Sequence, residues 1–516
     1  MTATPRNAGR PGGMAIAFLP LDERPVNTSL PSAVAAIAGA GLILPPAELL
    51  PQLREPGKAG DLGAWFRQAA ATADAAVASL DMLCYGGLIA ARTSGDTTLA
   101  ALERLETLRA IREDHPDLPI AAVSLVMRAS DSYNPQEEPD YWAQYGRELH
   151  RLGALHHRDL LVNLGVLDTP GNADELATLR AKLPTAILAD FERRRLRNHH
   201  VNLEALALAA DGTVDPLMIT ADDTAEHSGG SVEQIWLDQW ARVLPISAEV
   251  LMYPGADEVA AVLVARQLAT QLDARARFAV ETADPEGLGR IANYENSPMR
   301  VAIERQVKAS GAELTEDAEA MALVIHTSDP RRRDLCGQVP NFDADDEKDA
   351  QATLDVIARL IEQGREVALA DLRYSNGADP ILIERLAERG LLIKLLAYGG
   401  WNTAGNALGS VVAAAAAIQI GRAAGTYDAG EARRLLLHRI IEDYAYQAVA
   451  RRPLNAGILT FQTPDEERAA EARVGAELNA ILGRLTGRSD LKVSNINFPW
   501  HRSFEIDFVI EGDLAR

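Results

Sequence analysis

Residues 217–227 read LMITADDTAEH, and this short stretch contains the pattern that decides the fold. An apolar run, residues 217–220, passes directly into a polar turn, and a longer stretch with helical periodicity follows. The same rhythm recurs along most of the chain. Short apolar runs that alternate with helical stretches predict an α/β protein with mainly parallel strands.

Eleven apolar runs are long enough to be strands. They are residues 15–21, 41–44, 76–80, 120–127, 160–164, 217–220 and 249–253, and then 277–281, 322–326, 366–370 and 391–397. The first series fits either an eight-fold βα (TIM) barrel or a wide doubly wound sheet, and the spacing does not choose between them. The second series, with helices expected at residues 297–309 and 349–363, predicts a further Rossmann-like α/β domain.

The length of 516 residues indicates more than one domain, because single cores stop growing beyond roughly 250–300 residues. We expect a disordered leader at residues 1–13, an N-terminal α/β domain, barrel-like or doubly wound, at 14–275, and a second α/β domain at 276–425. A helical cap, residues 426–516, would end in a β-hairpin made of residues 491–498 and 503–510. If residues 277–281 are an eighth barrel strand, the first boundary moves to about 285.

Composition excludes several classes of protein. Lys and Arg total 51 against 73 Asp and Glu, a formal charge of −22, so nucleic acid is not an expected partner. The most apolar run, residues 407–420, is shorter than the ~20 residues that span a bilayer, and we expect a buried helix and no membrane partner. The two cysteines, Cys84 and Cys336, form no disulfide framework, which favours the cytoplasm. The oligomeric state stays open.

No cofactor is expected, because the chain lacks a GxGxxG after its first strand and a GxxxxGK[ST] motif anywhere.

The basic run at residues 331–333 opens a segment, 331–348, that has no regular period. We expect that segment to be a long surface loop of the kind that often serves as a lid or binding loop.

The sharpest catalytic candidates are Asp222 and Asp223, which directly follow an apolar strand. Two close carboxylates raise the pKa of one of them, and this allows a general acid to work beside an ionised partner. The pair could equally be a helix cap and a solvated acid. A metal site would need further ligands such as Glu226 and His227, whose spacing matches no established zinc motif.

Other strand ends carry polar and aromatic side chains that suit a hydroxyl-rich ligand, because ligands of parallel α/β proteins bind at the carboxyl ends of the strands. Aromatic faces stack on sugar rings, and amides bond to hydroxyl groups. The candidate substrate-binding residues are Asp22, Arg24, Asn27, Asp81, Tyr85, Arg128, Glu295, Asp371, Tyr374, Asn376, Trp401, Asn402 and Asn406. Tyr-Gly-Gly occurs twice, at Tyr85 and Tyr398, and we interpret this as shared turn chemistry unless the two halves are related.

Five ordered motifs, LPLDERPVNT (19–28), SLDMLCYGGL (79–88), TADDTAEH (220–227), YENSP (294–298) and AYGGWNTAGNALG (397–409), carry a resemblance to a known family. The chain resembles, over residues 14 to about 510, the bacterial family named only as domain of unknown function 4127. The resemblance implies a soluble bacterial protein of about this length, and it brings no activity with it.

The leading hypothesis is therefore a carbohydrate-active hydrolase that works in a cleft between the two α/β domains on a small-molecule or oligosaccharide substrate. In a substrate-assisted glycosidase acting on an N-acetylhexosaminide, Asp223 would be the acid and Asp222 would orient the 2-acetamido group. Two alternatives stay open. One is a metal-dependent hydrolase or lyase that uses Asp222, Asp223 and His227, and the other is a non-catalytic two-domain protein that binds a small ligand.

Overall fold

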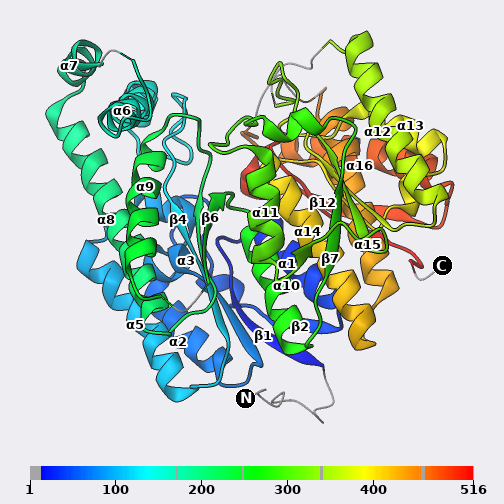
Figure 1. The fold of residues 1–516 in the computed structure, drawn as a ribbon, viewed down its shortest axis with the longest axis horizontal. Helices are drawn as coiled ribbons and strands as arrows, with labels where there is room; N and C mark the ends of the chain where they lie inside the picture. The colour runs from blue at the N-terminus through cyan, green and yellow to red at the C-terminus, as the bar shows by residue number, and fades with distance from the viewer. Residues whose placement is uncertain are drawn as a thin grey trace. The chain divides into compact units, whose positions relative to one another are not determined.

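A computed structural model of the chain describes residues 13–169, 172–246, 249–336, 341–452, 454 and 460–514. The leader expected at residues 1–13 lies, apart from Gly13, outside the described residues. The chain divides into two compact units (Figure 1). The N-terminal unit comprises Met1–Glu23, Gly41–Leu263 and Tyr294–Ser297, and the C-terminal unit comprises Arg24–Ala40, Val264–Asn293 and Pro298–Arg516.

The N-terminal unit is built on one six-stranded sheet with the order β2-β1-β3-β4-β5-β6. Its strands are β1 (Met14–Leu19), β2 (Ala40–Ile43), β3 (Ala75–Ser79), β4 (Ile120–Val126), β5 (Leu217–Ala221) and β6 (Val250–Pro254). The pairs β1–β3, β3–β4, β4–β5 and β5–β6 are parallel. Strands β2 and β6 are the edges of this sheet, so the unit has the open, doubly wound form and the barrel alternative is wrong.

Helices of the N-terminal unit cover the sheet, because strands buried on both faces need apolar partners on each side. They are η1 (Ala47–Leu49), α2 (Ala59–Ala70), α3 (Leu80–Tyr85), α4 (Leu88–Thr93), α5 (Thr98–Asp114), α6 (Trp142–Asn163), α7 (Ala173–Lys182), α8 (Thr185–Ala210) and α9 (Gly229–Val243). Helix α10 (Val259–Gln271) begins in this unit and ends in the other. The strand expected at residues 160–164 is wrong, because most of this apolar run continues the helical face of α6.

The C-terminal unit contains a five-stranded parallel sheet with the order β11-β10-β9-β7-β8. Its strands are β7 (Arg277–Glu281), β8 (Glu313–Leu314), β9 (Met321–His326), β10 (Val367–Asp371) and β11 (Ala397–Gly399). Counted within each unit, the first five strands follow the same spatial order, second-first-third-fourth-fifth. Tyr85 follows the third strand of its unit and Tyr398 lies in the fifth strand of the other, so Tyr-Gly-Gly does not mark equivalent positions.

The other elements of the C-terminal unit are mostly helices, and an antiparallel hairpin of β12 (Lys492–Asn497) and β13 (Asp507–Glu511) confirms the expected C-terminal hairpin. The helices are α1 (Pro25–Ile37), η2 (Pro285–Gly289), α11 (Met299–Ala309), α12 (Ala344–Glu362), α13 (Pro380–Glu388), η3 (Leu392–Lys394), α14 (Ala404–Ala424), α15 (Ala429–Arg439), the π-helix η4 (Ile440–Ala450), α16 (Pro464–Thr486) and η5 (Pro499–His501). The loop expected at residues 331–348 is shorter than predicted, because α12 begins at Ala344.

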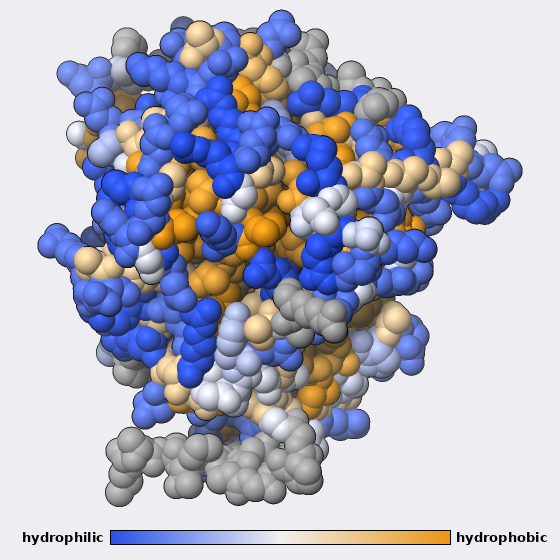
Figure 2. Space-filling model, turned by 90° about the vertical axis from the view of Figure 1, so that its right-hand side faces the viewer, coloured by the Kyte–Doolittle hydropathy of each residue, from blue (hydrophilic) through white to orange (hydrophobic). Residues whose placement is uncertain are grey.

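Helix α14 confirms the buried helix expected at residues 407–420. It is long and apolar enough to cross a membrane, but 78% of its most apolar window is buried inside the structure. Such burial is typical of a core helix in a soluble protein. The face of the molecule in Figure 2 shows apolar side chains gathered in a hollow, with hydrophilic side chains around it.

Candidate functional site

In the N-terminal unit, the point where the strand order reverses lies between β1 and β3, and doubly wound proteins bind ligands at the carboxyl ends of such strands. Asp22 and Asp81 follow these two strands, and both are buried. Asp81 lies in the first turn of α3, which Ser79 caps by accepting a hydrogen bond from Met82 N at 3.3 Å. Asp81 Oδ2 accepts a hydrogen bond from Leu125 N at 3.0 Å, and burial raises the pKa of Asp81 to about 7.

The catalytic candidates Asp222 and Asp223 follow β5, at the carboxyl edge of the same sheet. A buried guanidinium group, that of Arg92 in α4, pairs with Asp222. Arg128, which lies just beyond the end of β4, pairs with Asp223. Each of the two adjacent carboxylates therefore has its own arginine, and both are fixed in position.

Two further acids share these arginines. Glu137 accepts hydrogen bonds from Arg92 at 3.2 Å and from Arg128 at 2.9 Å, and Glu138 accepts one from Arg128 Nε at 2.9 Å. Four carboxyl groups, those of Asp222, Asp223, Glu137 and Glu138, thus surround two guanidinium groups. The fully ionised cluster carries an excess of negative charge, which favours a proton on one carboxyl group.

Within this cluster the pKa of Asp223 is raised. Desolvation raises the pKa of Asp223 to about 6, Arg128 lowers it, and the charge of Asp222 raises it again. The backbone of Asp223 has φ of 32°, a left-handed value that non-glycine residues rarely adopt. Such strained backbone persists where the surrounding structure imposes it, and it is often found at functional sites.

The segment Tyr294–Ser297 lies against the loop that carries Asp223. Thr224 N donates a hydrogen bond to Tyr294 O at 3.0 Å, and Asn296 Nδ2 donates to Ser231 Oγ at 2.9 Å. Glu295, a predicted binding residue, is buried in this segment. The charge of Glu295 acts on the nearby carboxyl group of Glu258 and raises the pKa of Glu258.

Glu258 follows β6 and is fully buried. Burial raises the pKa of Glu258 to about 8, and the charges of Glu295 and Asp257 raise it further. Gly255 is required beside it, because a Cβ atom at this position would lie 2.1 Å from Glu258 Oε1. The carboxyl edge of β5 and β6 therefore holds a second group of acids that carries a proton near neutral pH.

Tyr85 is buried at the end of α3, and the guanidinium group of Arg197 lies 4.5 Å from the centre of its ring. One face of this tyrosine is therefore covered by a cation rather than free for a sugar ring.

The residues around Asp222 and Asp223 do not form a typical metal site. An arginine is bonded to Oδ2 of each carboxylate, so both acids already have a cationic partner. The ring of His227 lies 5.5 Å from that of His157, and burial lowers the pKa of His157 to about 4. Within the described part of the chain, no group of three His, Cys, Asp or Glu side chains is placed to hold a metal.

The other predicted binding residues lie in the C-terminal unit. Asp371, the last residue of β10, accepts hydrogen bonds from Asp379 N at 2.7 Å and from Tyr398 Oη at 3.3 Å. Burial raises the pKa of Asp371 to about 6. Beside it in the sheet lies His326, whose Nε2 is 2.9 Å from Asp379 Oδ2 and whose Nδ1 is 2.8 Å from Thr353 Oγ1.

Asn376 and Asn402 lie in the turns after β10 and β11, and the structure brings them together. Asn376 N donates a hydrogen bond to Asn402 O at 2.9 Å, and both residues have left-handed φ values, 61° and 70°. Trp401 is buried with its ring 5.4 Å from that of Phe504, and its Nε1 has no hydrogen-bond partner in the described structure. Asn406 lies in the first turn of α14, which Thr403 caps.

Arg24 and Asn27 lie at the start of α1. The Arg24 guanidinium group is 3.6 Å from Glu505 and lies over the ring of Trp500 at 4.6 Å. Asn27 is fully buried in the first turn of the helix. Arg24 therefore belongs to a buried ionic and aromatic group of the C-terminal unit.

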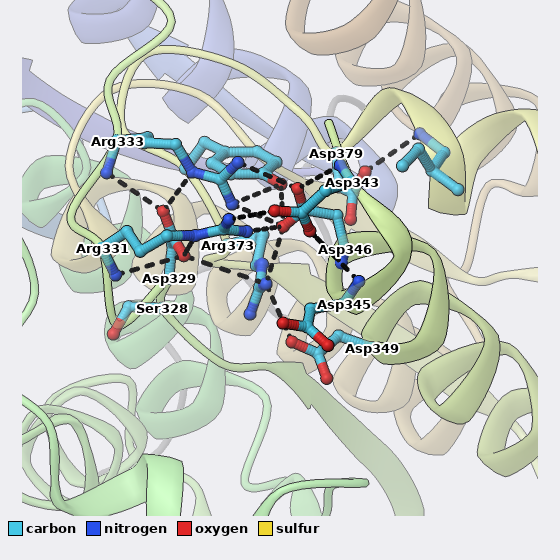
Figure 3. A network of polar contacts seen from close by, with 12 residues as sticks. Ser328, Asp329, Arg331, Arg333, Asp343, Asp345, Asp346, Asp349, Arg373 and Asp379 are labelled. Atoms are coloured by element: carbon cyan, nitrogen blue, oxygen red, sulfur yellow. Dashed lines mark hydrogen bonds and ion pairs between the residues drawn. The ribbon is translucent and has the colours of Figure 1, made fainter. Parts of the chain in front are cut away.

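Tyr374 belongs to a dense ionic network at the carboxyl ends of β9 and β10. Figure 3 shows the arginines and acids of this network around Asp346. The Tyr374 hydroxyl group donates to Asp346 Oδ1 at 3.3 Å, and Arg331, Arg333 and Arg373 donate to the same carboxylate. This network ties Arg331 and Arg333, at the start of the segment that was expected to be a surface loop, to Asp346 in the first turn of α12. The arginines are engaged by acids and do not form a free basic patch.

Sequence reasoning missed several residues of these groups, above all Arg92, Glu137, Glu138, Glu258, His326 and Asp379. Two of them had a usable signal: His326 ends an expected strand, and Glu258 closely follows another. Arg92 had none, because it lies in a helix far along the chain from its partner Asp222.

The family model described as a protein of unknown function, DUF4127, matches residues 16–509, which is nearly the whole chain. A search of curated proteins finds no match.

Proposed function

The chain belongs to the DUF4127 family, and from the residues of its N-terminal unit we propose that it is a glycoside hydrolase whose general acid is Asp223. One observation carries the proposal. Two adjacent carboxylates follow β5, and desolvation in an acid-rich cluster raises the pKa of the second to about 6, while 31% of its side chain stays exposed. A general acid works best when its pKa lies near the operating pH.

The chemistry follows from the two roles. Asp223 donates its proton to the glycosidic oxygen as the bond from that oxygen to the anomeric carbon breaks. Asp222 accepts a hydrogen bond from the N–H of a 2-acetamido group, which turns the carbonyl oxygen of that group toward the anomeric carbon, where it forms the new bond. Asp223 then takes a proton from water, and the water oxygen opens the cyclic intermediate.

The arginines support these roles. Arg92 holds Asp222 in one position, so the orienting carboxylate needs no rearrangement when the substrate arrives. Arg128 stabilises the carboxylate that Asp223 becomes after it gives up its proton. Asp22, Asp81 and Glu295 are the proposed substrate-binding residues of the same unit, and Asp22 and Asp81 lie at the point where the strand order reverses. Tyr85 is no longer among them, because Arg197 covers its ring.

The metal-dependent alternative is not favoured, because Asp222 and Asp223 each already have a cationic partner. We place the protein in the cytoplasm, since Cys84 and Cys336 are both free thiols.

The test is hydrolysis of a panel of chromogenic glycosides, N-acetylhexosaminides included, by the purified protein. We expect the Asp223→Asn variant to lose turnover by at least about 100-fold, the effect typical of a general acid. Asp238→Asn is the matched control, because Asp238 is a half-exposed aspartate of the same unit, paired with Arg242. Absence of hydrolysis across the panel, or full activity in Asp223→Asn, would overturn the proposal.

A further inference from the structure

A separate cavity lies within the C-terminal unit, between α1, the α15–η4 helix and β13. Its volume is about 270 Å³. Sites for small ligands are concave, mostly apolar and provided with a few polar groups. This cavity has both features, and neither the fold nor the proposed reaction requires it.

The walls of the cavity are apolar. Val26 and Leu30 of α1 form one side, and Phe508 and Ile510 of β13 form another. The imidazole ring of His438 stacks on Phe508, with centroids 4.2 Å apart and an angle of 6° between the rings. Burial lowers the pKa of His438 to about 3, so this ring is neutral and adds flat apolar surface.

The polar end of the cavity has two acids, Glu442 and Asp507, and two arginines, Arg434 and Arg439. Both arginines already have acceptors: Arg434 donates to Ile510 O at 2.6 Å, and Arg439 donates to Glu442 Oε2 at 2.8 Å and to Asp443. Burial raises the pKa of Glu442 to about 8; Arg439 lowers it, whereas the charges of Asp443, Glu505 and Asp507 raise it further. Three acids therefore act on Glu442 against one arginine that is already paired, and an additional cation there would be stabilised.

The helix that carries Glu442 is unusual. Residues Ile440–Ala450 form a π-helix, a rare form that occurs mostly as short insertions at functional sites. It begins at the cavity, directly after Arg439. An irregular helix beside a cavity is an arrangement that stability alone does not favour.

We propose that this cavity binds a small apolar molecule that carries one ammonium group. The apolar part lies between α1 and the Phe508–His438 stack, and the ammonium group pairs with the Glu442 carboxylate. A carboxylate ligand would add another anion to the acids around Glu442, whereas an ammonium group relieves their repulsion. Binding therefore ionises Glu442, and the proton that Glu442 held in the empty cavity passes to the solvent.

Benzylamine is a suitable probe, with benzyl alcohol and benzoate as its neutral and anionic counterparts. Calorimetry at pH 7 in phosphate and in Tris buffer measures both affinity and proton release. We expect benzylamine to bind at least tenfold more tightly than benzyl alcohol, with release of up to one proton. Failure of benzylamine to bind, or binding of benzoate with equal or higher affinity, would overturn the proposal.

Two variants locate the site. Glu442→Gln keeps the shape of the side chain, and we expect it to weaken benzylamine binding at least tenfold and to abolish proton release. Glu347→Gln, at an exposed glutamate of α12, is the control and should bind like the wild type. Ala33→Leu places a larger side chain in the cavity at a helical position. Loss of all benzylamine binding by this variant would confirm that the probe binds in the cavity. Unchanged binding in Ala33→Leu would place the bound probe elsewhere.

Discussion

The guanidinium group of Arg92 pairs with the carboxylate of Asp222, which lies 130 positions later in the chain. Both side chains are buried, with exposures of 2% and 8%. A buried ion pair adds little net stability, but loss of one partner leaves an unpaired charge inside the protein. The pair therefore fixes the carboxylate next to the proposed acid, and its disruption should be costly.

Arg92→Met is expected to lower the free energy of unfolding by about 3–5 kcal/mol, because Asp222 and Glu137 lose a buried partner. Asp222→Asn in the same background should recover part of this loss, and urea unfolding of the two single variants and the double variant measures the coupling. Arg193→Met, at a surface arginine that is 75% exposed, is the control and should change stability little. Strictly additive effects of Arg92→Met and Asp222→Asn would contradict an energetic link between the two residues.

The rate of the proposed reaction should depend on the protonation of Asp223. A general acid is active only while it holds its proton, so kcat/KM should fall as the pH rises through about 6. A pH profile of glycoside hydrolysis between pH 4 and 9 measures this limb. The limb should be absent from the residual activity of Asp223→Asn, and a profile that rises with pH instead would assign Asp223 to a different role.

Much of the fold could be predicted from local pattern. The strands that end at or just before Asp81, Asp222 and Asp371 lie where their apolar runs indicated, because apolar runs bounded by polar turns have few alternative structures. The run at residues 160–164 was misassigned, since a five-residue apolar segment cannot be distinguished from part of a long helix without its context. Strand β8 was missed because it has only two residues, Glu313 and Leu314.

The candidate site was predictable only in part. Strand ends gave Asp222, Asp223 and Asp81, since the chain itself places these residues at the edge of the sheet. Their partners could not be found, because pairings such as Arg92 with Asp222 depend on tertiary packing. Charge in the sequence is also a poor guide to burial: Arg197 lies close to Arg193, Arg194 and Arg195 in the chain, yet it is buried and donates to Ala91 O.

Asp81 should make stability depend on pH. The folded-state pKa of Asp81, about 7, lies above the ordinary 3.8. The protonated carboxyl group therefore stabilises the folded state fully below pH 3.8, and this stability is lost as the pH rises to about 7. Asp81→Asn keeps an acceptor for Leu125 N without a charge, and the variant should be more stable than the wild type at pH 8 by roughly 2–4 kcal/mol. Urea unfolding at pH 4.5, 6 and 8 measures the difference.

The difference between Asp81→Asn and the wild type should shrink toward pH 4.5. Asp131→Asn, at an exposed aspartate of the same unit, is the control and should follow the wild-type pH dependence. Parallel curves for Asp81→Asn and the wild type would show that Asp81 is ionised throughout this range.

Asp346 predicts the opposite pH dependence for the C-terminal unit. Its carboxylate is fully buried, and although burial acts to raise its pKa, hydrogen bonds from Arg333, the Asp343 backbone and Arg373 hold it well below the ordinary 3.8. A lowered pKa stabilises the folded state above pH 3.8, and this stability is lost as the pH falls further. Asp346→Asn should therefore cost about 3–5 kcal/mol at pH 7, because the arginines around it lose their shared anion.

Asp345→Asn is the matched control, since Asp345 is the preceding residue of the same helix but is exposed. Urea unfolding of both variants at pH 7 and pH 3 separates the two positions. Asp346→Asn should be much less stable than Asp345→Asn at pH 7. The difference between their free energies of unfolding should become smaller at pH 3, because the carboxylate of Asp346 then begins to stabilise the folded state less in the protein with Asp346 intact. A difference in free energy of unfolding that stays constant between pH 7 and pH 3 would mean that Asp346 acts through its shape and not through its charge.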